Sequence, residues 1–355
     1  SFSENNDTSE EFHTGFAFQR LSIQDLSNNA RQPMLCNNQR YLIVYNGEIY
    51  NFKEIKKSLI DKGHTFKSNS DTEIVLKLYE LYKEEMLYFL NGMFSFVIYD
   101  NLKDSFFIVR DRLGIKPLYY YINKNELLIA SEIKSFLFYP NFIPEFNNAI
   151  LNEYMMFGYQ SSSQTAFQNV HECLPGHYMI FENNELKIIK YWDSSKKSNL
   201  NFEAKNVMND LSDLVHSSIN YQLISDVEVG CQLSGGIDSS LIAAIACSNS
   251  KSFKKTFSVV LENNMLNEEK YIDYVNSTFS LQENKSLLRN DEIIDTLELA
   301  TWHHDLPISQ PNSIGIYKLA KEAKKHLKVL LSGEGADEIF GGYDRYNAAR
   351  LFTSM

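Results

Sequence analysis

Short apolar runs separated by polar turns fill the first half of the chain. From residue 40 to residue 191 these runs are rich in aromatic or β-branched residues and bounded by Asn, Gly or Asp, which is typical of sheet strands. Two segments with helical apolar spacing, 51–62 and 71–83, interrupt them. The pattern predicts an α+β domain built on β-sheets. The predicted strands cover residues 41–45, 93–99, 105–109 and 126–130, with a hairpin formed by 178–181 and 186–191.

The pattern changes near residue 195. Residues 194–201 are polar and show no periodicity, which predicts a linker. After a helical stretch over 202–223, strands and helices alternate, and this order favours a parallel sheet with helices on both faces. We therefore predict two domains, 1–193 and 202–355, the second of α/β class. Its predicted strands are 228–233, 256–260, 285–288 and 328–331, and its helices are 238–246, 268–275 and 313–324.

Composition and charge narrow the class of protein. The chain has 355 residues, 44% of them hydrophobic, which is enough for two cores. Its net charge of −11 argues against a nucleic-acid partner, because a phosphate backbone requires a basic face. The four cysteines show no close pairing, and no apolar stretch reaches the length of a membrane span. We therefore expect a reduced, cytoplasmic protein with no membrane partner.

The clearest chemical motif lies between the predicted strand 228–233 and the predicted helix 238–246. It reads Leu233, Ser234, Gly235, Gly236, Ile237, Asp238, Ser239, Ser240. Its glycines let backbone amides approach an anion, its hydroxyls donate to phosphate oxygens, and the helix N-terminus adds partial positive charge. A lone Ser-Gly-Gly would only indicate a helix cap. The full pattern at the end of a parallel strand predicts a pyrophosphate site instead.

A second motif follows the predicted strand 328–331. It reads Ser332, Gly333, Glu334, Gly335, Ala336, Asp337, Glu338. Acids in a first helical turn usually serve only the helix dipole. Here Asp238 and Asp337 form a natural pair of ligands, since Mg²⁺ is usually held by one or two carboxylates and by substrate phosphates. The sequence has no Walker lysine motif.

Charged and polar residues in the first half suit a glutamine pocket. Arg20 can bind an α-carboxylate with two hydrogen bonds, and Glu48 and Asp71 can receive an α-ammonium. Asn46 and the Gly47 amide suit an oxyanion hole, although Asn-Gly alone is the strongest short signal for a hairpin turn. We interpret the run from 110 to 117 mostly as a structural turn.

Together these motifs resemble the glutamine-hydrolysing asparagine synthetase family. The carrying segments are 19–23, 46–51, 70–73, 92–94, 110–120, 233–240 and 331–346. The resemblance implies an αββα glutaminase-like sandwich, which is a class II (Ntn) amidotransferase domain. It also implies a following domain with the adenine-nucleotide α-hydrolase-like fold, an N-type ATP pyrophosphatase. These enzymes cleave ATP between the α and β phosphates, so the resemblance favours adenylation.

The resemblance also implies roles for individual residues. Glu334 orients or deprotonates the attacking ammonia, and Asn46 and Gly47 act in the glutaminase reaction. Mg²⁺ is bound by Asp238 and Asp337. Glutamine is bound by Arg20, Leu21, Ser22, Ile23, Gln24, Asn46, Gly47, Glu48 and Asp71. ATP is bound by Leu233, Ser234, Gly235, Gly236, Asp238, Ser239, Ser240, Val259, Ser332 and Gly333.

Two family features have no counterpart in the sequence. The family's glutaminase nucleophile is an N-terminal cysteine followed by Gly-Ile, whereas this sequence starts with Ser1. A terminal serine can act through its own amine, but the residues around Ser1 do not match. We expect the family's first segment to be missing through truncation, omission of disordered residues or genuine loss. The C-terminal lysine that the family places on the α-phosphate is also absent before Met355.

The resemblance leaves the acyl acceptor most open. We expect a ligase that uses ATP, Mg²⁺ and glutamine to amidate aspartate. The alternatives are a relative that acts on another carboxylate, of surface-polysaccharide or β-lactam type, and a binding module with an inactive glutaminase. Residues 304–317 resemble the family's acceptor stretch but lack the Thr-Thr-x-Arg of some members. The expected partners are small-molecule substrates and, as one arrangement, a second copy in a homodimer.

Overall fold

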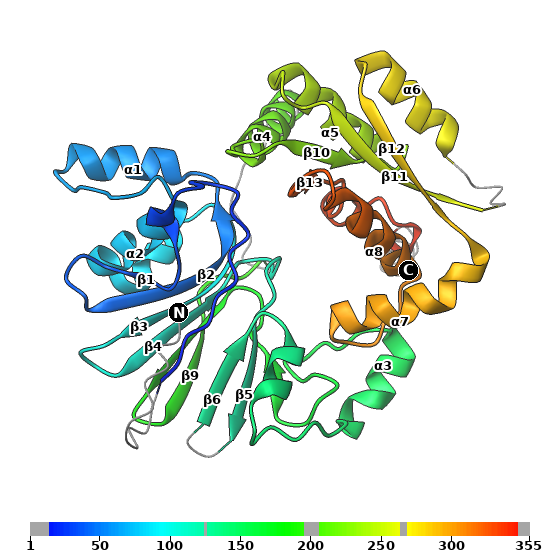
Figure 1. Cartoon of the computed structure of the whole chain (residues 1–355). Helices are drawn as coiled ribbons and strands as arrows, with labels where there is room; N and C mark the ends of the chain where they lie inside the picture. The colour runs from blue at the N-terminus through cyan, green and yellow to red at the C-terminus, as the bar shows by residue number, and fades with distance from the viewer. Residues whose placement is uncertain (1–13, 124–125, 195–205, 263–267, 347–355) are drawn as a thin grey trace.

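The structure is a computed structural model that describes residues 14–123, 126–194, 206–262 and 268–346. Two sheet systems lie side by side in it, with the first half of the chain on one side and the second half on the other (Figure 1). The predicted linker, 194–201, and the boundary between the two predicted domains fall almost entirely on residues outside the described ranges. The exact domain limits therefore stay predictions.

The first half contains two antiparallel sheets. The larger has the order β1-β2-β3-β4-β8-β9 and the smaller has the order β6-β5-β7. The strands of the larger sheet are β1 (Met34–Leu35), β2 (Tyr41–Ile49), β3 (Gly92–Asp100), β4 (Ser105–Arg110), β8 (His177–Glu182) and β9 (Glu185–Lys190). Those of the smaller are β5 (Tyr119–Asn123), β6 (Glu126–Ala130) and β7 (Val170–Glu172).

These sheets form the middle of a layered sandwich. Helices α1 (Phe52–Asp61) and α2 (Asp71–Tyr82) cover one face of the larger sheet, and the fully buried Phe94 and Phe96 belong to the core beneath them. The opposite face packs on the smaller sheet through Ile108 and Tyr120. Short helices lie around this sandwich: η1 (Asn28–Ala30), η2 (Lys83–Tyr88), η3 (Ile133–Phe138), η4 (Asn148–Ile150) and α3 (Leu151–Phe157). This arrangement confirms the predicted α+β sandwich.

The second half is built on a four-stranded parallel sheet in the order β12-β11-β10-β13. Its strands are β10 (Val229–Gln232), β11 (Lys255–Leu261), β12 (Gln282–Leu288) and β13 (Val329–Leu331). Its helices are α4 (Val207–Gln222), α5 (Ile237–Asn249), α6 (Glu269–Phe279), η5 (Asn290–Glu292), α7 (Ile293–His304), α8 (Asn312–Ala323) and α9 (Ala336–Phe340).

Helices cover both faces of this sheet. On one face α5 and α6 bury Ala243 and Ile272 against the strands, and α4 packs beside α5. On the other face α8 buries Leu319 and Ala323 against Phe257 of β11. The α/β prediction is therefore confirmed.

Local signals placed most elements within a few residues, and two turn signals are informative. The Asn46-Gly47 pair is not a hairpin turn: it lies inside β2 and pairs with Ser95 and Phe94 of β3. The predicted hairpin of 178–181 and 186–191 is confirmed as β8 and β9, and in its turn Asn183 and Asn184 both have positive φ angles, of 53° and 61°. Such left-handed pairs suit the right-handed twist of a two-residue hairpin.

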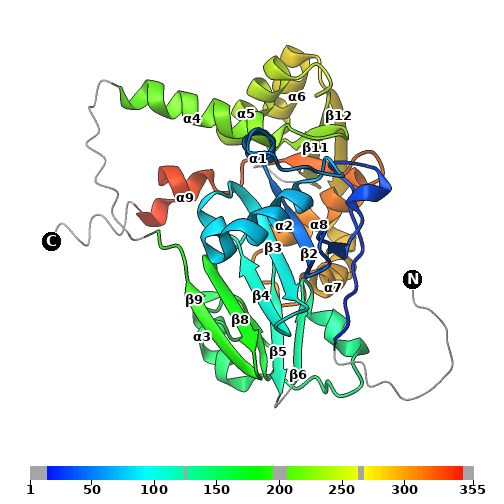
Figure 2. The same ribbon diagram turned by 90° about the vertical axis from the view of Figure 1, so that its left-hand side faces the viewer.

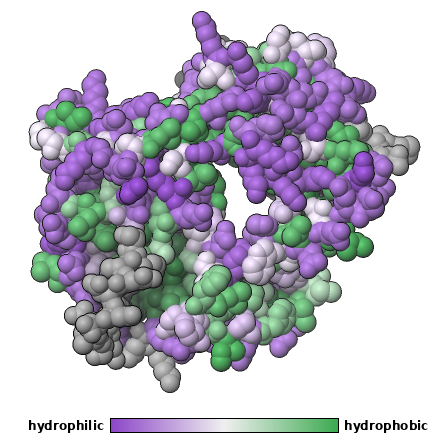
Figure 3. Space-filling view, viewed as in Figure 1, coloured by the Kyte–Doolittle hydropathy of each residue, from purple (hydrophilic) through white to green (hydrophobic). Residues whose placement is uncertain are grey.

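The two halves touch at separate places. The loop at residues 22–25 contacts the start of the parallel sheet, and the Lys134 ammonium pairs with the Asp305 carboxylate at 2.8 Å. The same Asp305 carboxylate accepts a hydrogen bond of 2.8 Å from the Ile133 N–H. The view turned by 90° shows α1 and α2 of the first half lying below the parallel sheet (Figure 2). The space-filling view shows an opening through the molecule between the two halves (Figure 3).

Candidate active site

The Asn46-Gly47 pair is fixed by its position in the larger sheet. A Cβ on Gly47 would lie 2.7 Å from the Cα of Phe94, so only glycine allows β2 to approach β3 this closely. The Asn46 side-chain amide donates to the Ser131 hydroxyl at 3.3 Å, a contact that joins β2 to the loop after β6. These contacts place a side-chain amide at the edge of the predicted glutamine pocket.

Two carboxylates lie next to this pair. Asp71 begins α2 after the capping residue Ser70, is buried, and accepts from the Ile49 N–H at 2.9 Å and the Tyr45 hydroxyl at 2.7 Å. Burial, together with repulsion from the nearby Asp71 carboxylate, raises the pKa of Glu48 to about 8. Two acids that share one partly buried site form a natural receptor for a cation such as an α-ammonium.

Lys116 is a cation close to Glu48 that the sequence analysis did not identify. Burial lowers the pKa of the Lys116 ammonium, while attraction to Glu48 and Asp111 opposes that shift. Its position follows from the turn between β4 and β5, where the Asp111 carboxylate accepts backbone N–H bonds from Leu113, Ile115 and Lys116. The run at 110–117 is thus confirmed as a structural turn. It also places the Lys116 ammonium near the Glu48 carboxylate.

The loop at residues 20–25 lies against the same carboxylates. The Gln24 amide donates to the Glu48 carboxylate, and the Gln24 Oε1 atom is buried without a hydrogen-bond partner among the described residues. The Arg20 guanidinium donates to the carbonyls of Ser27 at 3.1 Å and Gln24 at 2.9 Å, and to that of Asp25. Arg20 therefore joins three backbone carbonyls of this segment.

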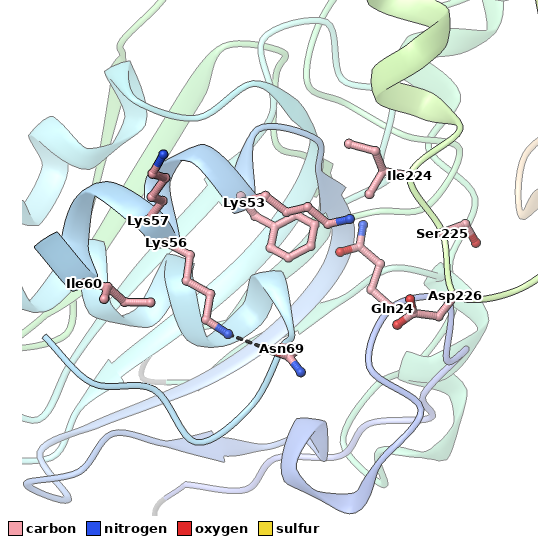
Figure 4. A pocket seen from close by; sticks show the side chains of 10 residues that line it. Gln24, Lys53, Lys56, Lys57, Ile60, Asn69, Ile224, Ser225 and Asp226 are labelled. Carbon is pink, nitrogen blue, oxygen red and sulfur yellow. Dashed lines mark hydrogen bonds between the residues drawn. The ribbon is translucent and has the colours of Figure 1, made fainter. Parts of the chain in front are cut away.

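Beside this loop lies a pocket of about 530 Å³ between the two halves (Figure 4). Gln24 and Asp226 line it from one side, and Lys53 and Lys56 of α1 line it from the other. The Lys56 ammonium is already occupied, since it donates to the Ser68 carbonyl at 2.8 Å and to the Asn69 side chain at 2.7 Å.

The first nucleotide motif forms a compact turn between β10 and α5. Gly235 has a φ of 88°, a conformation that favours glycine. The Ser234 and Ser239 hydroxyls lie 3.0 Å apart, and the Ser240 hydroxyl donates to the Gly236 carbonyl at 2.7 Å. The backbone therefore wraps the start of α5 with hydroxyls grouped at its N-terminus, as an anion site requires.

The second motif lies directly against the first. A Cβ on Gly333 would lie 3.0 Å from the Ser239 backbone nitrogen and 3.1 Å from the Asp238 Cβ. Gly335 has a φ of 93° and caps the short helix α9, whose first turn carries Asp337. The structure thus brings together two loops that are about a hundred residues apart in the chain.

The structure also places three further predicted site residues, Glu334, Leu233 and Val259. Glu334 is exposed, and its backbone N–H donates to the Ser332 hydroxyl at 3.3 Å. The Leu233 N–H bonds to the Phe257 carbonyl at 2.9 Å, and its carbonyl accepts from the Ser258 hydroxyl at 2.7 Å. The carbonyl of Leu233 keeps one lone pair for a further donor. The Val259 side chain packs on the α8 side of the sheet.

Comparison with known proteins bears on this geometry. The family model "Glutamine amidotransferase domain" matches residues 3–192, and the model "Asparagine synthase" matches residues 210–354. The chain belongs to the glutamine-hydrolysing asparagine synthetase family. It is 38% identical to asparagine synthetase [glutamine-hydrolyzing] 1 of Bacillus subtilis over 335 residues, covering 94% of this chain and 52% of that protein.

Other members of the family show how far the likeness extends. Asparagine synthetase [glutamine-hydrolyzing] 3 of Bacillus subtilis is 34% identical, with 96% of this chain and 58% of that protein covered. Amidase chry2 of Gibberella zeae is 32% identical, with 97% of this chain and 53% of that protein covered. The chain therefore spans a little over half the length of these relatives.

The described residues show whether the predicted magnesium site has suitable ligands. Among the described residues no group of three or more His, Cys, Asp or Glu side chains is placed to hold a metal ion by itself. Two carboxylates in adjoining loops nevertheless fit Mg²⁺ that arrives with a nucleotide, because phosphates and water supply its remaining ligands. Asp238 and Asp337 are the donors present. Also within the described residues, no helix is long and apolar enough to cross a membrane.

Proposed function

We propose that the full-length protein is a glutamine-dependent asparagine synthetase. ATP and aspartate would form β-aspartyl-AMP and release pyrophosphate, and ammonia would then displace AMP to give asparagine. Hydrolysis of glutamine to glutamate would supply that ammonia. The observation that supports this proposal is the close approach of Gly333 to Asp238 and Ser239, because it brings the two predicted nucleotide motifs together on the chain that also holds Glu48 and Asp71.

The nucleotide loops supply the adenylation chemistry in this proposal. The hydroxyls of Ser234, Ser239 and Ser240 and the amides at the start of α5 would hold the pyrophosphate. A Mg²⁺ ion bound by Asp238 and Asp337 would neutralise charge on the leaving phosphates. Glu334 is exposed on the adjoining loop, where it can orient or deprotonate ammonia as it attacks the acyl-adenylate.

The first half of the chain would bind glutamine and hydrolyse its side-chain amide. Glu48 and Asp71 would receive its α-ammonium and Arg20 its α-carboxylate, while Asn46 and the Gly47 amide would stabilise the oxyanion. The wall of the pocket between these groups would be formed by Leu21, Ser22, Ile23 and Gln24. Arg20 now bonds to loop carbonyls, so binding glutamine would require its guanidinium to exchange at least part of those bonds for the carboxylate.

Loss of the Arg20 side chain is expected to weaken glutamine use selectively. Arg20→Ala should raise the KM for glutamine about tenfold or more, as for loss of a charge-assisted hydrogen bond, and should change the KM for ammonia far less. Steady-state asparagine formation with each nitrogen donor measures the difference. Arg31→Ala is a matched control on the same segment. Equal effects on both donors would show that Arg20 serves only the fold of the loop.

The acceptor pocket needs a cation for the α-carboxylate of aspartate, and residues 305–317 contain none. Lys318 is already engaged, because its ammonium pairs with Glu292 at 2.6 Å. Arg345 is exposed, with its guanidinium 4.2 Å from the centre of the Tyr343 ring, and is the freer of the two cations. Aspartate remains our first choice of acceptor, and a different carboxylate is the second candidate because of this shortage of cations.

The decisive experiment supplies the full-length protein with ammonia, Mg-ATP and one carboxylate at a time. We expect AMP and asparagine in equal amounts with aspartate. Formation of AMP only with a sugar acid or a β-amino acid precursor would keep the adenylating site and replace the acceptor. If no carboxylate gives AMP although the protein binds ATP, the non-catalytic binding module would be favoured.

A further inference from the structure

The loop at residues 22–25 is held from the opposite half of the chain. The Asp226 carboxylate accepts a hydrogen bond from the Asp25 N–H at 2.8 Å, and the Asp226 N–H donates to the Ile23 carbonyl at 3.1 Å. The Lys328 ammonium donates to the Ser22 carbonyl at 3.1 Å. Three backbone groups of the loop, on Ser22, Ile23 and Asp25, therefore bond to residues more than two hundred positions away in sequence.

The other side of the loop faces the carboxylate pair. The Gln24 amide donates to Glu48, and the Asp25 carboxylate accepts the Asn69 N–H at 2.6 Å just before α2 begins. Gln24 and Asp226 lie together at the edge of the pocket (Figure 4), and Gln24 and Asp25 are both buried. The loop backbone and side chains are therefore joined by polar contacts to both halves of the chain.

Asp226 and Lys328 have related positions in the parallel sheet. Asp226 lies shortly before β10, and Lys328 directly precedes β13, which pairs with β10 in parallel. At the other ends of the same two strands lie the motifs that begin at Ser234 and Ser332. Strands of three or four residues span only about 10–13 Å, so each contact with the loop is one short strand away from a nucleotide motif.

We propose that Asp226 and Lys328 are positioning residues that hold the 22–25 backbone in the conformation that binds glutamine. The inference rests on the proposed function, because it assigns these residues to the glutamine site. A loop that is fixed before its ligand arrives loses less conformational freedom on binding, so releasing it weakens binding. The glutamine site of the first half thereby depends on the second half for its affinity.

The test compares variants that remove a contact with variants that keep it. In the full-length protein, Asp226→Ala and Lys328→Met should each raise the KM for glutamine roughly three- to tenfold, and should leave ammonia-dependent synthesis within about twofold. Asp226→Asn keeps an oxygen acceptor and Lys328→Arg keeps a donor, so both should stay near the wild-type KM. Asp61→Ala and Lys325→Met are the controls, since both residues are exposed and the Lys325 ammonium pairs with Glu322.

A second measurement reads the loop itself. Amide hydrogen exchange should rise in a peptide spanning 22–27 of Asp226→Ala, with β2 and β3 unchanged, which shows that the protein is still folded. An unchanged glutamine KM in both Asp226→Ala and Lys328→Met, or equal loss with both nitrogen donors, overturns the inference while leaving the proposed function standing. Failure of the wild-type protein to use or bind glutamine overturns the proposed function, and the inference with it.

Discussion

Replacing Asp238 with Asn in the full-length protein is expected to lower aspartate-dependent exchange of pyrophosphate into ATP by about a hundredfold or more. A metal ion on transferring phosphates is worth several kcal/mol, and each 1.4 kcal/mol changes a rate about tenfold. An amide keeps the shape of the side chain and removes the charge that holds Mg²⁺. Asp337→Asn should act similarly, since both residues are assigned to the same ion.

The glutaminase activity serves as the internal control for these variants. It should stay within about twofold of wild type, because Asp238 and Asp337 lie in the second half and contact none of the carboxylates in the first. Glu338→Gln is the matched control, because its carboxylate accepts from the Tyr343 hydroxyl at 2.9 Å and has no assigned ligand. Normal exchange in both aspartate variants would remove the metal assignment.

Most of the fold could be predicted from the sequence, because apolar residues in both halves recur with the simple periods of strands and helices. Runs bounded by turn residues located β3 and β4, and the alternation of strands and helices identified the parallel sheet. Helix α7 was not predicted, since its apolar residues spread around its circumference and both Ile294 and Trp302 are exposed. A helix without a single apolar stripe gives a weak periodic signal.

Local chemistry alone was misleading where tertiary contacts override it. An isolated Asn-Gly pair favours a hairpin, but Gly47 is required inside β2 because the β3 backbone lies so close. The cation at Lys116 could have been suspected from its place in the 110–120 run, whereas its attraction to Glu48 needs the folded chain. The bonds from Asp226 and Lys328 to the 22–25 loop join distant segments, and no periodicity marks such contacts.

The pKa of Glu48 has a consequence for folding that does not depend on the proposed function. A carboxyl whose pKa rises to about 8 in the folded protein binds its proton more tightly there than in the unfolded chain. Its contribution to stability is therefore present below its ordinary pKa and is lost as pH rises toward about 8. Thermal unfolding of Glu48→Gln should lose this part of the pH dependence, because the amide does not titrate.

The pKa of Glu48 also predicts how the KM for glutamine changes with pH. Without ligand, Glu48 is mostly protonated below about pH 8, whereas the α-ammonium of glutamine prefers the ionised carboxylate. The KM for glutamine should therefore fall as pH rises from about 6 to about 8, by at most tenfold per unit, and then level off. Glu48→Gln should raise that KM about ten- to a hundredfold near pH 8 and flatten its pH profile, because a neutral amide loses the charge-assisted bond. Kinetics with glutamine at several pH values, divided by those with ammonia at the same pH, isolate this effect. A wild-type profile that Glu48→Gln leaves unaltered would assign the ammonium to Asp71 alone.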